Sequence, residues 1–379
     1  MARDTLVGWL GTFFQLLIRL SWGVIAVPIA LLLKLNSIQI GFVATSFYIG
    51  YVAASIPWGL VIDRIGPKRT IALSSSFLFI TNLLLFFSPI RDYAFLVLLY
   101  LIEGLIASAI FPSAMKIVAI THSSRLTFYV ALLESAAPAT IILLGLISTL
   151  LLNAWKLTFL SLAIAFGLIA VLSALWISVS SKPTEMKRSF KVILDKRIAL
   201  ATLLRFGELW ATWGTSTWIF SMLVLYRHIS TSLSALFLFI YGIGQLIGIL
   251  SVERLSWKIG DAKTILANIL GFIVMTSLIV ITPIVSLYLL EAFFLGVFSF
   301  SYRPPTDSLI MKMGGNGREA TSIAFANSIS QMGTMIAPSF VGLILYLTKS
   351  FVFSMLGLNV GMVISLISLI LLVKWKTNY

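Results

Sequence analysis

The chain of 379 residues contains no cysteine, only two histidines and only 13 acidic residues. Without cysteine there can be no disulfide bond and no thiolate metal site. His122 and His228 stand far apart and no Asp-x-x-x-Asp cluster supports them, so an enzyme that works through Mg²⁺ or a histidine base is not expected. A Gly-x-x-x-x-Gly-Lys-Ser/Thr loop is also missing, which argues against ATP hydrolysis. No metal or cofactor is predicted.

Charge is scarce as well. Charged residues make up 11% of the chain and hydrophobic residues 59%, whereas a soluble domain carries about 25% charge. Lipid is therefore the expected solvent, and the expected fold class is an all-α polytopic membrane protein. Because about 20 apolar residues cross a bilayer as a helix, the sequence predicts twelve transmembrane helices, at residues 7–33, 38–62, 70–89, 93–118, 127–151, 157–179, 198–225, 231–252, 264–283, 286–311, 320–346 and 351–373. The first has no small-residue cleavage site and is interpreted as a retained helix.

Lysine and arginine are concentrated in alternate connections between the predicted helices. With the amino terminus placed in the cytoplasm, 19 of the 27 basic residues lie in inward connections and ends, five lie outward and three lie within helices. This is the positive-inside pattern, so both termini are predicted to be cytoplasmic in a protein of the cytoplasmic membrane. The net charge of +14 is spread over short loops, which indicates attraction to anionic lipid headgroups and not to nucleic acid.

One long inward connection, residues 180–197, divides the predicted helices into two sets of six. It holds six basic and two acidic residues and is interpreted as a tether, with lipid or partner binding as the alternative. Residues 1–179 and 198–379 are then expected to form two six-helix bundles. The halves resemble each other, because residues 59–71 (GLVIDRIGPKRTI) and 253–265 (ERLSWKIGDAKTI) share basic, Ile, Gly and Thr positions at an offset of 194. Ala137-Pro138 and Ala337-Pro338 are a weaker match. Tandem halves of this kind recur in transporters.

Residues 59–71 resemble the loop motif between the second and third helices of the major facilitator superfamily. The matching residues are Gly59, Asp63, Arg64, Gly66, Lys68 and Arg69. Pro67 stands where a basic residue is usual, and Trp257 replaces the acid in the second copy. The resemblance implies two pseudo-symmetric bundles and an inner gate at this motif.

The motif residues have expected roles of their own. We expect Gly59 and Gly66 to allow close approach and a tight turn, and Asp63 to sit at a helix amino terminus, where its charge is favoured. The basic residues are expected to bind acids or headgroups. A topology signal in a solvated turn is the alternative interpretation.

Eight charged residues fall inside the predicted helices. They are Arg19, Glu103, Glu134, Arg205, Glu208, Glu291, Arg303 and Asp307. Because charge is costly in hydrocarbon, each is expected to face a cavity or a partner. The third, sixth, ninth and twelfth helices carry none of them. In the family these four helices face lipid, whereas the first, fourth, seventh and tenth line a central cavity.

Polar residues recur at helical spacing and define the predicted substrate cavity. The stripes consist of Thr12, Gln15, Arg19 and Trp22; Arg205, Glu208, Thr212 and Thr215; Tyr241 and Gln245; and Asn327, Gln331 and Thr334. Arg19 is the preferred substrate-binding residue, because its guanidinium offers a planar fork to a carboxylate or phosphate. Trp22 could stack on the solute. The alternative for Arg19 is a static ion pair with Glu103.

The other charges suggest local pairs and a break. Candidate proton carriers are Glu103, Glu208 and Asp307, because burial and a neighbouring arginine act in opposite directions on a carboxyl group. Arg205 is expected to pair with Glu208, and Glu134 with Lys116 or Arg125, while Glu291 is expected to be hydrated. Pro304-Pro305 are predicted to break or kink the tenth helix between Arg303 and Asp307.

These features predict a monomeric secondary transporter. It would move a small solute by alternating access, coupled to protons, with a small organic anion favoured as the solute. A drug-type proton antiporter and a non-transporting membrane sensor on the same scaffold are the alternatives. A polytopic lipid or prenyl transferase is disfavoured, because the acid clusters that such chemistry needs are missing.

Overall fold

The computed structural model describes residues 3–89, 92–122, 126–179, 195–282, 287–314 and 319–376, and within these ranges it contains helices and no strand. The predicted tether at 180–197 lies outside the described residues except for its last three. The all-α fold class is confirmed.

Each of the twelve predicted transmembrane helices is present, and three of them are divided into two segments. The helices are α1 (Arg3–Leu33), α2 (Ser37–Ile65), α3 (Pro67–Phe87), α4 (Tyr93–Ala107) with α5 (Ile110–Thr121), α6 (Leu126–Glu134) with α7 (Ala136–Asn153), α8 (Trp155–Trp176), α9 (Lys196–Leu225), α10 (Thr231–Ile259), α11 (Asp261–Ile281), α12 (Tyr288–Phe300) with α13 (Arg303–Gly314), α14 (Glu319–Thr348) and α15 (Phe351–Lys376).

The three divided helices share one cause. Each division lies within about one turn before a proline: at 108–109 before Pro112, at Ser135 before Pro138, and at 301–302 before Pro304-Pro305. Proline has no amide hydrogen and clashes with the carbonyl one turn earlier, so the helix is interrupted just ahead of it. The break predicted for the tenth helix is confirmed, whereas the sequence analysis did not foresee the divisions of the fourth and fifth.

The carboxyl ends of α2 and α10 extend further than predicted, and each turn that follows is a single glycine. Gly66 and Gly260 have φ of 83° and 88°, a conformation that only glycine adopts without strain. Thr70 donates its hydroxyl to the Gly66 carbonyl at 2.8 Å, and Thr264 donates to the Gly260 carbonyl at 2.9 Å. The sequence repeat therefore corresponds to two turns of the same backbone geometry.

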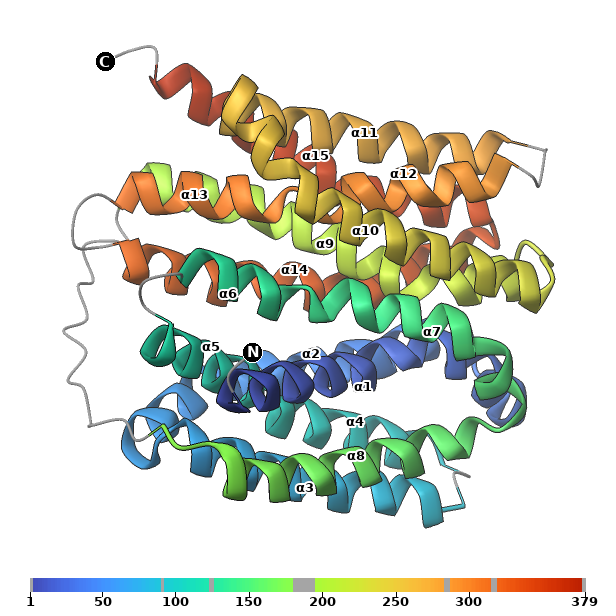
Figure 1. Ribbon diagram of the computed structural model, residues 1–379. Helices are drawn as coiled ribbons and strands as arrows, with labels where there is room; N and C mark the ends of the chain where they lie inside the picture. The colour runs from blue at the N-terminus through green and yellow to red at the C-terminus, as the bar shows by residue number, and fades with distance from the viewer. Residues whose placement is uncertain are drawn as a thin grey trace. The chain divides into compact units, whose positions relative to one another are not determined.

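The chain divides into two compact units. The N-terminal unit comprises Met1–Asn36 and Phe42–Met186, and the C-terminal unit comprises Ser37–Gly41 and Lys187–Tyr379. In the N-terminal unit α3 packs along α8, as Figure 1 shows, and α1 packs on α5, α7 and α8. In the C-terminal unit α9 packs on α14 and α15, and α10 packs on α12.

Glycine pairs allow helices to cross at close range in both units. Gly50 and Gly104 bring α2 and α4 together, and Gly244 and Gly296 do the same for α10 and α12; a methyl group on any of the four would overlap a backbone carbonyl of the facing helix. Small residues at such crossings are typical of membrane helices. Helix contact therefore leaves no space for a side chain at these four positions.

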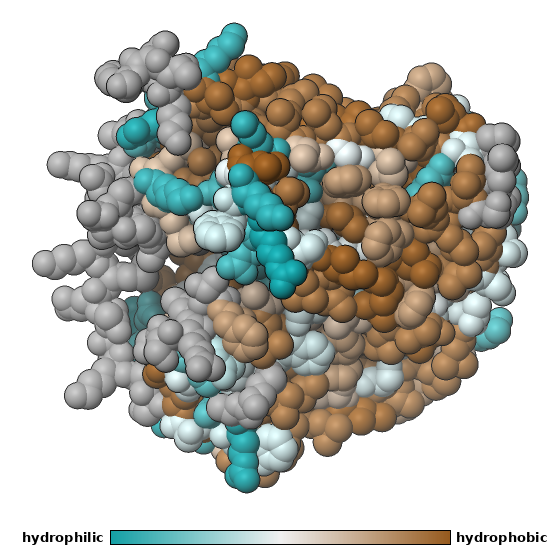
Figure 2. Space-filling view, turned by 45° about the horizontal axis from the view of Figure 1, so that its top comes forward, coloured by the Kyte–Doolittle hydropathy of each residue, from teal (hydrophilic) through white to brown (hydrophobic). Residues whose placement is uncertain are grey.

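The outward faces of four helices are apolar. On α3 the exposed side chains follow steps of four and three residues, at Leu73, Phe77, Ile80, Leu84 and Phe87, and comparable faces occur on α8, α11 and α15. In Figure 2 hydrophobic residues cover most of the visible described surface, and hydrophilic ones gather mainly toward one edge. Such faces suit contact with lipid, and among the described residues ten helices are long and apolar enough to cross a membrane.

Candidate functional site

The largest group of charged side chains inside the helices belongs to the C-terminal unit, where α9 meets α13. Arg205 on α9 forms an ion pair with Asp307 on α13, and its Nη2 lies 3.4 Å from the Asn327 side-chain oxygen on α14. Thr306 donates its hydroxyl to Glu208 Oε1 at 2.9 Å. Arg205 and Glu208 are almost completely buried. Two residues of α9 are thus held by consecutive residues of α13.

This arrangement differs from the predicted local pair. Arg205 and Glu208 lie one turn apart, but each takes its closest described polar partner from another helix. The reason is the break before Pro304-Pro305, which starts α13 at Arg303 and places Thr306 and Asp307 in its first two turns. Arg303 lies over the ring of Phe300 at 5.6 Å from its centre.

Further polar groups surround the break in the C-terminal unit. Thr212 on α9 donates to the Ser299 carbonyl, close to the end of α12. The amide of Gln245 lies 3.3 Å from the Ser299 hydroxyl. Among the described residues, Gln331 Oε1 and the Thr334 hydroxyl on α14 are buried without a hydrogen-bond partner. The structure thus brings polar groups of α9, α10 and α12 together just ahead of α13.

A second polar group lies in the N-terminal unit, on α1 and its neighbours. Arg19 is 7% exposed and its guanidinium lies over the ring of Tyr48, 5.7 Å from the ring centre. Trp22 packs edge-on against Tyr100, with ring centres 5.2 Å apart. Gln15 is buried one turn from Arg19. A cation and two aromatic rings are therefore brought together within one unit.

Glu103 on α4 has a different partner from the one considered in the sequence. The carboxyl group is fully buried, and the Thr81 hydroxyl on α3 donates to its Oε1 at 3.3 Å. The Thr81 hydroxyl is thus the contact that the structure gives this carboxyl group. The alternative of a static Arg19–Glu103 pair stays a prediction.

The motif at residues 59–71 is placed differently from two of its expectations. Asp63 lies in the last turn of α2 and not at a helix amino terminus, and it pairs with Lys116 on α5 at 2.7 Å. A negative charge is unfavourable at a helix carboxyl end, so the lysine offsets that cost. A methyl group on Gly59 would meet nothing within 4 Å, so no close approach requires this glycine, whereas Gly66 does form the tight turn.

The remaining basic residues of the motif lie at the turn between α2 and α3. Arg64 and Arg69 are exposed and Lys68 is partly exposed. Among the described residues, Asp63 is the member of the motif that forms an ion pair. Lys116 has Asp63 as its partner. The expected pairing of Glu134 with Lys116 or Arg125 stays a prediction, since Arg125 lies outside the described residues.

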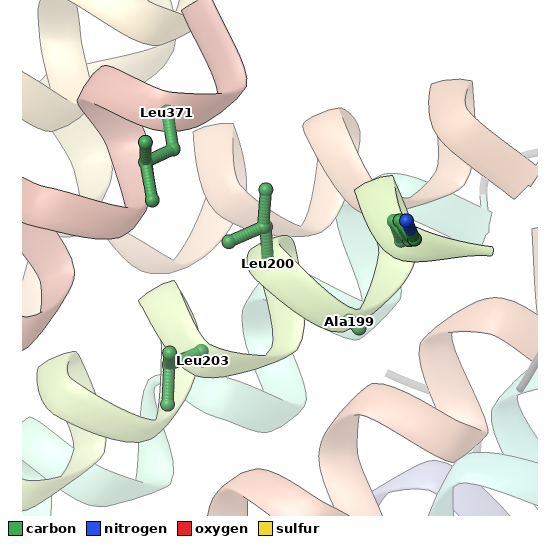
Figure 3. Close-up of a pocket in the computed structure, with 5 residues that line it drawn as sticks. Ala199, Leu200, Leu203 and Leu371 are labelled. Carbon is green, nitrogen blue, oxygen red and sulfur yellow. The ribbon is translucent and has the colours of Figure 1, made fainter. Parts of the chain in front are cut away.

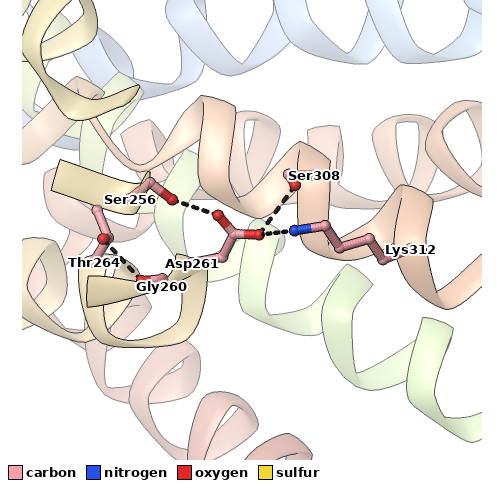
Figure 4. Close-up of polar contacts among 6 residues, drawn as sticks. All are labelled: Ser256, Gly260, Asp261, Thr264, Ser308 and Lys312. Atoms are coloured by element: carbon pink, nitrogen blue, oxygen red, sulfur yellow. Dashed lines mark hydrogen bonds and ion pairs between the residues drawn. The ribbon is translucent and has the colours of Figure 1, made fainter. Parts of the chain in front are cut away.

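For two further acidic residues the structure differs from the sequence analysis. Glu291 was expected to be hydrated, but it is 7% exposed and accepts a hydrogen bond of 2.6 Å from Thr282. Asp261, which the sequence analysis overlooked, is the first residue of α11 and forms an ion pair with Lys312 on α13 at 2.5 Å (Figure 4). Asp261 aligns with Pro67 of the first copy, whereas Asp63 of the first copy aligns with Trp257. A search for an acid at position 257 therefore misses Asp261.

A surface groove of about 400 Å³ lies between the amino end of α9 and the carboxyl end of α15. It is lined by Lys196, Ala199, Leu200, Leu203 and Leu371. In Figure 3 the leucine side chains lie around the space between the two helices. A lining that is almost wholly apolar offers nothing to orient a polar solute, so the buried polar groups, and not this groove, form the candidate substrate site.

A membrane-embedded helical protein with charged side chains in its interior and with divided helices has the architecture of a solute transporter. Comparison with known proteins specifies the class. The chain belongs to the Major Facilitator Superfamily, whose family model matches residues 8–338. Membership places it among membrane transporters and not among enzymes.

Solved structures of transporters share the fold. A mutant of the nucleoside transporter NupG has a TM-score of 0.78 and 13% identity, covering 98% of this chain and 99% of that one. A D-xylose-proton symporter has a TM-score of 0.76 and 16% identity, covering 97% and 95%. A bacterial homologue of the human lysosomal transporter Spinster, inward-facing and occupied, has a TM-score of 0.73 and 14% identity, covering 100% and 96%.

Proposed function

We propose that this protein is a proton-coupled secondary transporter that moves a small organic anion across the cytoplasmic membrane by alternating access. The observation that carries the proposal is the set of charged side chains in the interior of the helices, above all Arg205 and Glu208, buried on α9, with Asp307 on the divided helix α12–α13. A buried ion pair contributes little net stability compared with apolar packing. Such groups in membrane helices are therefore functional by default.

Arg19 supports an anion as the solute. Its guanidinium always carries charge and presents a fork that matches a carboxylate or phosphate. The Tyr48 ring lies beneath the Arg19 guanidinium, and Trp22 follows Arg19 by about one helical turn on α1, so these rings can cover an apolar part of the same solute. We therefore assign anion binding to Arg19, whose planar fork suits a charged group of the solute.

Two carboxyl groups in the two units support coupling to protons. Glu103 and Glu208 are both fully buried, and in each a threonine hydroxyl donates to one oxygen. Their second oxygens have no hydrogen-bond partner among the described residues. A carboxylate with an unpaired buried oxygen is costly, and a proton removes that cost. Loading and release of a proton at these positions can then accompany movement of the solute.

Orientation and surroundings follow from the charge pattern. The excess of basic residues in alternate connections supports cytoplasmic placement of both termini and contact of the inner face with anionic headgroups. A monomer is the proposed functional form, because each unit has its own closely packed glycine crossings.

A drug-type exporter is the alternative, and aromatic residues in the helices could favour its apolar solute. Trp210 and Trp218, however, donate their ring N–H groups to the carbonyls of Gly357 and Pro338 on neighbouring helices. Buried tryptophans of this kind serve helix packing, so these two rings do not support an apolar solute.

Flux into proteoliposomes tests the proposal. Purified protein would first be screened by thermal shift against carboxylate and phosphate metabolites, sugars, amino acids and hydrophobic cations, and the stabilising solutes would then be assayed with and without a pH gradient. We expect an anion to bind and its uptake to respond to the gradient. Binding without flux would instead identify a sensor, and no response to the gradient would refute proton coupling.

Matched variants locate the roles. Arg19→Gln should abolish anion binding, whereas Arg197→Gln, a change of the same type at an exposed side chain, should leave it intact. Glu208→Gln and Glu103→Gln should remove the response to the pH gradient while solute exchange persists. If anion binding survives Arg19→Gln, the assignment of Arg19 is wrong.

A further inference from the structure

Helix α13 is a short segment that carries two different sets of contacts. Its backbone is interrupted from α12 at Ser301 and Tyr302, so continuous helical hydrogen bonding does not hold it in line. Its first two turns provide Thr306 and Asp307 to the buried residues of α9. The next residue, Ser308, and Lys312 one turn later bind a different partner, Asp261.

Asp261 connects three helices through one carboxylate. Ser256 on α10 donates its hydroxyl to Oδ1, Ser308 donates to Oδ2 at 3.0 Å, and Lys312 donates to Oδ2 at 2.5 Å, as Figure 4 shows. Asp261 is also the first residue of α11, where the helix dipole favours a negative charge. Although Lys312 is 68% exposed, Asp261 is only 17% exposed, so the carboxylate is the fixed centre of this cluster.

The N-terminal unit contains a related contact on its own divided helix. Lys116 lies on α5, the second segment of the fourth transmembrane helix, and it binds Asp63 beside the glycine turn. In the second copy the acid position is occupied by Trp257, which is 90% exposed. Asp261, on the other side of Gly260, provides the carboxylate instead. Both units thus tie the second segment of a divided helix to a glycine turn.

We propose that Asp261 is a positioning residue for the buried charges of the C-terminal unit. By holding Ser308 and Lys312 it fixes the rotation and axial position of α13, and so keeps Thr306 on Glu208 and Asp307 on Arg205. Asp307 and Ser308 are adjacent in one helix, so a rotation of α13 that breaks one contact also displaces the other. The inference concerns the position of α13 and can fail or succeed independently of transport.

The absence of cysteine makes a direct test possible. A single reporter, Ile310→Cys, would be introduced on α13, where the native side chain is completely buried, and its reaction with a small maleimide would be timed in the full-length protein. Adding Asp261→Asn should increase the labelling rate about five- to tenfold, because loss of charge-assisted hydrogen bonds makes local opening of α13 easier. Lys312→Gln should give a smaller increase.

Two matched controls separate positioning from general loss of stability. Asp63→Asn removes the corresponding acid of the N-terminal unit and should leave labelling at Ile310→Cys unchanged. A reporter at Leu295→Cys, equally buried on α12, should not respond to Asp261→Asn. Unchanged labelling at Ile310→Cys in the Asp261→Asn variant would overturn the proposal, as would an equal increase at Leu295→Cys. If Asp261→Asn does not fold, the same comparison with Lys312→Gln decides the question.

Discussion

Removal of one partner from the Arg205–Asp307 pair should destabilise the protein more than removal of both. The perturbation is a double-mutant cycle of Arg205→Met and Asp307→Leu. Loss of one member of a buried ion pair costs about 3–5 kcal/mol because the other charge remains uncompensated. Replacement of both by apolar residues is often close to neutral.

The burial of the two side chains predicts that the single variants differ. The Arg205 side chain is 3% exposed and cannot lose its proton, so Asp307→Leu should cost the full amount, about 3 kcal/mol or more. The Asp307 side chain is 24% exposed and can gain water or a proton. Arg205→Met should therefore cost less, about 1–2 kcal/mol.

Denaturant unfolding in detergent micelles, followed by the fluorescence of the ten tryptophans, measures these free energies. The double variant should lie within about 1 kcal/mol of the native protein, which corresponds to a coupling energy of about 3 kcal/mol between the two residues. Additive losses, with the double variant equal to the sum of the two single variants, would refute the pairing and with it the position assigned to α13.

Three further results are expected. Gly104→Ala, which would push a methyl group into the Phe47 carbonyl, should lower the free energy of unfolding by about 1–3 kcal/mol or more, whereas Gly59→Ala has open space and should leave it unchanged or raise it; equal losses would contradict the close crossing. Asp63→Asn should insert and fold normally yet transport slowly, and normal flux would remove its gate role. Burial raises the pKa of Asp195, but hydrogen bonds from the Arg197 side chain and backbone outweigh this and hold the pKa below its usual value; its stabilisation of α9 should therefore be complete above about pH 4 and fade as the pH falls further. Asp195→Ala should remove this pH dependence from the unfolding curve.

The transmembrane helices and the break in the tenth could be predicted because they depend on local sequence. Long apolar stretches and Pro304-Pro305 act on the backbone wherever the helix packs. The divisions near Pro112 and Pro138 follow the same rule and were accessible to it. The glycine turns were predictable in part: Gly66 was expected to turn, but the extent of α2 beyond residue 62 depends on packing against α5.

The polar partners could not be predicted because they depend on how helices far apart in sequence align. Helical spacing places Arg205 beside Glu208, yet the structure supplies each with a residue about 100 positions away. The axial position of α13 against α9 decides that choice, and no local pattern encodes it. Asp261 was missed for a related reason: its charge lies four residues from the aligned position but reaches the same kind of lysine partner.

The single-glycine turns restrict which parts of each unit can deform. Residues on both sides of Gly66 are helical, and the Thr70 hydroxyl donates a hydrogen bond to the glycine carbonyl. The turn between α2 and α3 is therefore rigid. The same holds for α10 and α11. During a transport cycle the two helices of each hairpin should move together as one rigid body. The flexible points are then the breaks in the divided helices, and the energy barrier to opening and closing the pathway is set there.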